Sequence, residues 1–173
     1  MLSDNRERLR RLALDAAFLG LALILSYVES LFPVSVLIAL PGFKLGLANI
    51  IVLWLAVNLS AWDAGVVSLL RVSIVAMLFG TPMSFWFSFG GAFCSFLSIL
   101  LVRRLPFFSY IGASVLSAAA HNFGQLVAAS CLFGIGTMLA YLPIMLVAAV
   151  IFGALCGMLL NLIAPRMERG GSI

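Results

Sequence analysis

The residues that could do chemistry in this 173-residue chain are a few polar side chains inside long apolar stretches. His121, Asn122 and Gln125 lie within five consecutive residues, and Arg71 stands in the middle of an earlier apolar run. On a helix the three neighbouring side chains lie at about 0°, 100° and 40° around the axis, so they share one face. Together with an arginine, they could bind an anionic or hydrogen-bonding group. The pattern predicts a pocket for a polar small molecule.

Further polar residues could extend this candidate substrate-binding site. Lys44 and Asn49 are the main candidates, and Asn58 is a weaker one. The alternative is structural, because a single buried histidine is commonly a satisfied core residue and amides commonly link transmembrane helices. Asp15 and Glu29 lie near the two ends of the first apolar run, where we expect them to reach the membrane interface. The sequence leaves the binding and the structural interpretation open.

Patterns typical of catalysis, metal binding or nucleotide hydrolysis are missing from the sequence. It contains no G-x-x-x-x-G-K-[ST] loop, and its six acidic residues are too scattered to hold Mg²⁺ against a diphosphate. His121 has no carboxylate in its own apolar run, and the three cysteines stand singly. We therefore expect no enzyme, no metal and no cofactor. The function classes that fit a pocket without these patterns are a channel, a passive carrier or one part of a larger transporter.

Transmembrane helices must position these side chains. Apolar residues make up 64% of the chain and charged residues 9%, against about 25% charged in a soluble domain. A helix needs roughly 20 apolar residues to cross the bilayer, so the length leaves room for about six spans. The runs are apolar on every face, unlike the alternating strands of a membrane barrel. The expected fold is an all-α integral membrane protein with six transmembrane helices.

Short polar or proline-containing turns separate the six expected spans. A transmembrane domain over 12–164 is expected between tails at 1–11 and 165–173, with the last helix stopping at Pro165. The expected spans are 12–31, 45–61, 64–80, 83–102, 107–133 and 138–164.

The distribution of basic residues predicts the orientation. With six spans, eight of the ten Lys and Arg residues fall on the side of the two termini, Lys44 falls on the other side, and Arg71 lies inside a span. Basic residues collect on the cytoplasmic side, so both termini of this multi-pass protein are predicted to be cytoplasmic, in the plasma membrane. The same asymmetry accounts for the net charge of +4. Membrane lipid is an expected partner, and nucleic acid is not.

The apolar segment 30–43, which joins the first two spans, is too short to cross the membrane and is bracketed by Pro33 and Pro41. It would lie on the outer side. There it could be a lid or re-entrant piece over a pocket, or a loop resting among the lipid headgroups.

Small residues recur at intervals of four along several runs. In the first run they are Ala13, Ala16, Ala17 and Gly20. Small side chains let two helices approach closely in lipid. Packing inside the bundle explains most such residues, whereas on the first helix they could also dock on a partner membrane protein.

Several stretches resemble one family of membrane proteins. They are Pro41–Asn49, Arg71, Leu78–Gly80, Phe89–Gly91 and Ala120–Gln125. These stretches are similar to the Gx transporter family, also labelled heptaprenyl diphosphate synthase component I. The chain also resembles the substrate-binding S components of energy-coupling factor transporters in size, helix number and small-residue first helix. That resemblance implies an S-component-like bundle that captures a small molecule from outside and relies on a partner T component and ATPase subunits. The alternative is a non-catalytic membrane component of heptaprenyl diphosphate synthesis.

Overall fold

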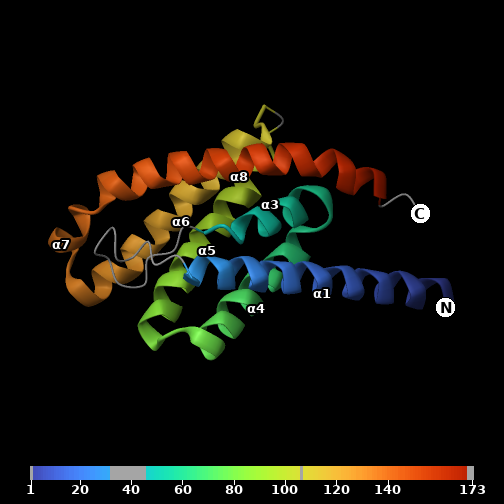
Figure 1. The fold of residues 1–173 in the computed structure, drawn as a ribbon, viewed down its shortest axis with the longest axis horizontal. Helices are drawn as coiled ribbons and strands as arrows, with labels where there is room; N and C mark the ends of the chain where they lie inside the picture. Colours follow the sequence, from blue (N-terminus) through green and yellow to red (C-terminus); the bar gives the residue numbers. More distant parts are fainter. Residues whose placement is uncertain (1, 32–45, 106, 171–173) are drawn as a thin grey trace.

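The computed structural model describes residues 2–31, 46–105 and 107–170, and the regular elements in these ranges are all helices (Figure 1). The all-helical fold class expected from the sequence is therefore confirmed for the described residues. The helices are α1 (Leu2–Leu31), α3 (Asn49–Asn58), α4 (Ala61–Phe79), α5 (Pro82–Val102), α6 (Tyr110–Phe133), α7 (Ile135–Leu139) and α8 (Leu142–Gly170).

Five of these helices, α1, α4, α5, α6 and α8, are long and apolar enough to cross a membrane. Large apolar side chains also cover the outside of the molecule, and Leu12, Val150 and Leu162 are each more than half exposed. A continuous apolar exterior of this kind is stable in lipid rather than in water. The chain is a multi-pass membrane protein.

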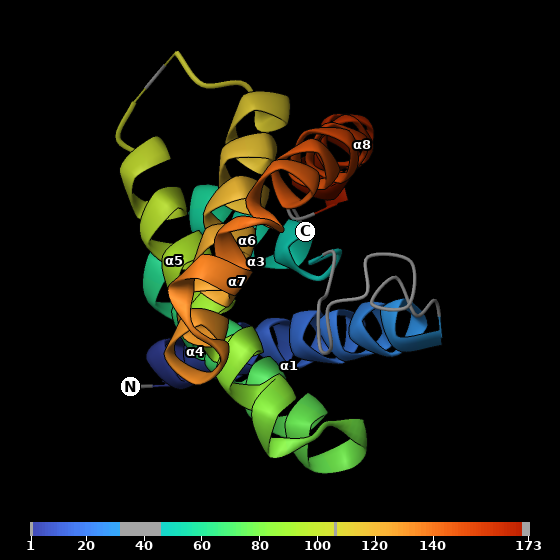
Figure 2. The same ribbon diagram turned by 90° about the vertical axis from the view of Figure 1, so that its left-hand side faces the viewer.

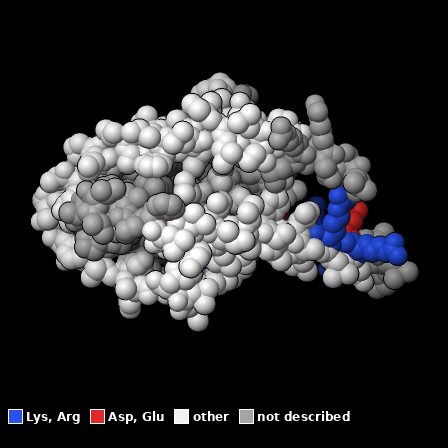
Figure 3. Space-filling view, viewed as in Figure 1, with Lys and Arg blue, Asp and Glu red and all other residues white. Residues whose placement is uncertain are grey.

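The long helices surround α3. In Figure 1, α1 and α8 run along opposite sides of the molecule and α3 lies between them. Figure 2 shows α5 and α8 flanking α6. The N-terminal end of α1 and the C-terminal end of α8 lie at the same end of the long axis (Figure 1). Basic side chains gather at this end, where the first turns of α1 carry exposed arginines (Figure 3).

The second expected span is shorter than the sequence indicated. α3 has ten residues, and a helix of this length rises about 15 Å, roughly half the hydrocarbon thickness. Eight of the ten residues, Asn49–Ala56, are buried inside the protein. The run 45–61 is apolar because other helices surround it. The six expected spans thus correspond to five full-length helices and one short internal helix.

Several expected helix boundaries are wrong. α1 begins at Leu2 rather than at 12, α6 begins at Tyr110 rather than at 107, and the run from 138 is divided between α7 and α8. The stretch 61–63 is the first turn of α4 rather than a reversal, because the Ser60 hydroxyl caps this helix by accepting from the backbone N–H groups of Trp62 and Asp63. The final helix does not stop at Pro165 but continues to Gly170. A proline removes only one helical donor, and at the end of a span water can satisfy the carbonyl that it leaves unpaired.

Glycines allow the helices of the second half to pack closely. A β-carbon at Gly153 or Gly157 of α8 would lie 2.7 Å from the Val115 Cα or 2.5 Å from the Ile111 Cα of α6. This spacing leaves no room for a side chain at either glycine. The small residues of α8 therefore pack inside the bundle, as the sequence indicated.

Candidate ligand-binding site

The chain is not helical just before α3, at a buried position among the long helices. Gly46 has a φ of +79°, a conformation that glycine adopts readily, and its N–H donates a 2.7 Å hydrogen bond to Glu29 Oε1 on α1. Non-helical backbone at membrane depth is tolerated only where protein buries it or where it lines a cavity. The positive end of the α3 dipole also lies here, close to the acceptor carboxylate. This buried turn before α3 is the first component of the candidate site.

A buried arginine lies beside this turn. Arg71 of α4 is 6% exposed, and its Nη2 donates to Oδ1 of Asn49, the first residue of α3, over 3.2 Å. Glu29 is also 6% exposed and interacts favourably with the charge of Arg71. An unpaired charge is very unfavourable in a low-dielectric interior. The opposite charges of these two side chains therefore stabilise each other.

Helices α5 and α6 provide the other wall of the site. His121 Nε2 and Gln125 Nε2 lie 2.9 Å apart in a hydrogen-bonding contact along one face of α6. A β-carbon at Gly91 of α5 would lie 2.8 Å from His121 Cε1 and 2.9 Å from Gln125 Cγ. A glycine at position 91 is therefore needed for this pair to face the interior.

A small cavity lies among these groups. Its volume is about 10 Å³, and its polar lining comes from α1, α4, α5, α6 and the turn before α3, through Ser26, Glu29, Gly46, Arg71, Ser88 and His121. A space of this size holds about one water molecule. Among the described residues, Arg71 Nε, Ser88 Oγ and Asn49 Nδ2 are buried without a hydrogen-bond partner. The site therefore has unused donors and acceptors in a compact space.

The structure brings together four of the side chains that the sequence singled out, namely Asn49, Arg71, His121 and Gln125. Asn122 does not join them, because its Nδ2 donates a 2.7 Å bond to the Met145 carbonyl of α8. A helix rotates by about 100° per residue, so His121 and Asn122 face different neighbours.

Other candidates lie elsewhere. Asn58 is bonded to the Trp54 carbonyl and the Tyr110 hydroxyl, away from the cavity lining. Lys44 and the expected lid, 33–44, lie outside the described residues. The structure therefore does not bear on the roles expected for Lys44 and for this segment.

Glu29, which the sequence placed near the membrane interface, is buried among the helices and accepts a hydrogen bond from the Gly46 N–H. One signal in the sequence could have identified Glu29 as a site residue. A buried arginine needs an opposite charge nearby, and an acidic residue in an apolar run can supply it. Asp15, the other such acid, is partly exposed and lines a shallow pocket with Arg11 and Asp63. No feature of the sequence marked Ser26 and Ser88 as site residues, because isolated serines are common in transmembrane helices.

The fold and this cluster define a multi-pass membrane protein with a buried polar site next to the N-terminal end of a short internal helix. The family model described as heptaprenyl diphosphate synthase component I matches residues 18–163, so the chain belongs to that family. The match includes Glu29, Asn49, Arg71 and His121. No curated protein and no solved structure gives a significant match.

Proposed function

We propose that this chain is the substrate-binding membrane subunit of an energy-coupling factor type uptake transporter for a small molecule. The observation that supports it most is the polar cluster at the N-terminal end of α3, built from Glu29, Gly46, Asn49 and Arg71. Transporters commonly bind substrates near the middle of the membrane, where discontinuous helices present dipole ends and free backbone groups. A fully structural cluster would have little need of unpartnered buried donors.

The chemistry of the cluster indicates the ligand class. Arg71 supplies a fixed positive charge with an unpartnered Nε, and Ser88 and Asn49 supply neutral hydrogen-bonding groups. These groups suit a small molecule with an anionic or hydrogen-bonding group. The cavity of about 10 Å³ is far smaller than a ligand, so binding requires the surrounding helices to move apart. The proposal therefore includes a more open ligand-bound conformation.

The proposal also includes a partner T component and ATPase subunits. The small-residue face of α1 is available for docking, because Ala13, Ala16 and Ala17 are exposed and a β-carbon at Gly20 would have no atom within 4 Å. A second helix could approach this face closely. In this proposal both termini are cytoplasmic, the protein lies in the plasma membrane, and the polar cluster receives its ligand from outside.

Purification of the full chain from its native membrane tests this function. We expect ATPase subunits and a second membrane protein to co-purify, together with a small polar molecule that mass spectrometry identifies after extraction. A prenyl synthase subunit in place of the ATPases would contradict the transport proposal.

A non-catalytic role in heptaprenyl diphosphate synthesis is the second candidate, and the description of the matching family favours it. In that role the chain would serve as an accessory membrane subunit, with Arg71 contacting a diphosphate. Prenyl chain elongation by the catalytic subunit should then depend on this chain. In either role, we propose that this chain itself catalyses no reaction.

A further inference from the structure

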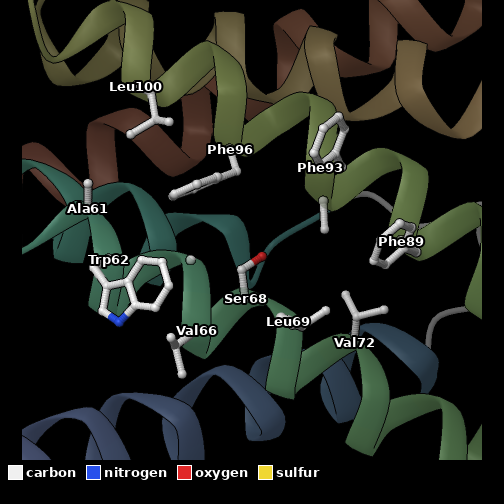
Figure 4. Close-up of a pocket in the computed structure, with 12 residues that line it drawn as sticks. Ala61, Trp62, Val66, Ser68, Leu69, Val72, Phe89, Phe93, Phe96 and Leu100 are labelled. Carbon is white, nitrogen blue, oxygen red and sulfur yellow. The ribbon is translucent and has the colours of Figure 1, made fainter.

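A long apolar groove lies between α4 and α5, on the outside of the molecule (Figure 4). Its volume is about 500 Å³, and Val66, Leu69, Phe89 and Phe93 are among its lining side chains. Figure 4 shows the α4 side chains on one wall and the phenylalanines of α5 on the other. Leu69 and Phe93 are more than half exposed, so the groove opens toward the surrounding lipid.

The length of the groove corresponds to one leaflet of the membrane. Its lining runs from Ala61 to Val72 on α4 and from Phe89 to Leu100 on α5. Each stretch rises about 16 Å, against a hydrocarbon thickness of about 30 Å for the two leaflets. A lipid chain that enters the groove from one membrane surface and fills it would therefore end near the middle of the bilayer.

One end of the groove has the residues of a membrane interface. Trp62, in the first turn of α4, is 79% exposed and lines this end. Leu100 lines the same end from α5, and the exposed Arg103 and Arg104 follow it within four residues. Tryptophan favours the headgroup region, and arginine forms strong paired hydrogen bonds with phosphate oxygens. The groove therefore has an apolar body and a basic mouth.

We propose that this groove binds one acyl chain of an anionic phospholipid, whose phosphate lies against Arg103 and Arg104. A phospholipid fits because the groove is one leaflet deep, whereas a long prenyl chain would extend past its inner end. Val72 lines both the groove and the polar cavity. The bound chain would thus pack directly behind the part of α4 that carries Arg71, and would support the wall of the polar site.

A blocking substitution tests the apolar body. The full chain is placed in nanodiscs of phosphatidylglycerol and phosphatidylcholine, and native mass spectrometry counts the lipids that it retains. Leu69→Trp fills the groove and should remove one retained lipid. Leu70→Trp, at the next position on α4 and outside the groove lining, should leave the count unchanged. If Leu69→Trp does not fold, Val66→Trp blocks the same wall. Equal retention by the blocked and control variants would overturn the proposal.

The same measurement tests the basic mouth. One arginine at a membrane surface favours an anionic lipid by about fivefold, so Arg103→Gln or Arg104→Gln should each reduce the preference for phosphatidylglycerol by about that factor. Arg6→Gln, an exposed arginine on α1, is the matched control and should not change the preference. An unchanged preference in both mouth variants would overturn the headgroup assignment. Preferential retention of added geranylgeranyl diphosphate over phosphatidylglycerol would overturn the choice of a phospholipid.

Discussion

The polar cavity and the apolar groove share the side chain of Val72, yet they differ in every other respect. The cavity is about 10 Å³ and is lined by charged and hydrogen-bonding groups, whereas the groove is about 500 Å³ and almost wholly apolar. In a soluble protein the largest apolar pocket is the default ligand site. In a membrane protein the surrounding solvent is itself apolar, so a large apolar groove indicates lipid. The small cavity, where buried polar atoms lack partners, is the better candidate for a soluble ligand.

The largest expected effect comes from breaking the charge balance of the polar cavity. Arg71→Met removes a buried guanidinium that hydrogen-bonds Asn49 and lines the cavity together with Glu29, and we expect the free energy of unfolding to fall by about 3–5 kcal/mol. Unfolding in detergent measures this loss. Glu29→Gln in the same background removes the negative charge that interacts with Arg71 and should recover part of the stability. If the two substitutions destabilise additively, the charges of these residues are independent.

Glycine substitutions compare the packed interior with the lipid-facing surface. Gly91→Leu forces a side chain into His121 and Gln125 and should destabilise the protein by about 1–3 kcal/mol. Gly20→Leu, on the open face of α1, should not reduce stability, because a side chain there meets nothing. In the proposed transporter it should instead abolish association with the partner membrane protein. A stable Gly91→Leu variant with wild-type ligand content would contradict the close packing described for the site.

Two neighbouring positions on α6 separate ligand binding from helix packing. His121→Ala should reduce the small molecule retained on the purified protein by more than about tenfold, a loss of roughly 1.4 kcal/mol in binding free energy. Asn122→Ala should leave the retained ligand unchanged and reduce stability by about 1 kcal/mol, because it removes the bond to the Met145 carbonyl. Quantitative mass spectrometry of the extracted ligand and thermal unfolding provide the two readouts. The reverse pattern would assign His121 to helix packing.

The smallest expected effect lies in the groove. Phe93→Ala should change the free energy of unfolding by less than about 0.5 kcal/mol, because this exposed side chain contacts lipid and lipid can replace it. Unfolding in lipid nanodiscs measures the change. A large destabilisation would mean that Phe93 packs on protein and that the groove is narrower than described.

Much of the architecture was predictable from residue type alone. Long apolar runs predicted α1, α4, α5, α6 and α8 because a helix must match the thickness of the hydrocarbon layer. The same rule wrongly predicted a full membrane span at α3, because hydropathy shows only that a segment avoids water. A helix buried by other helices and a helix in lipid therefore have the same composition. The sequence likewise indicated that Arg71 must face the interior, because lipid cannot accept its charge.

Only the tertiary structure decided which groups share the interior with Arg71. It placed Glu29 beside Arg71 and directed Asn122 toward α8, although the sequence predicted Asn122 in the site and Glu29 at the membrane interface. Helix periodicity determines the angles between residues of one helix, but not the rotation or depth of that helix relative to its neighbours. Those quantities depend on contacts between distant segments, such as the fit of Gly91 against His121 and the turn at Gly46. No local pattern records such contacts, because each becomes favourable only when both partners are in place.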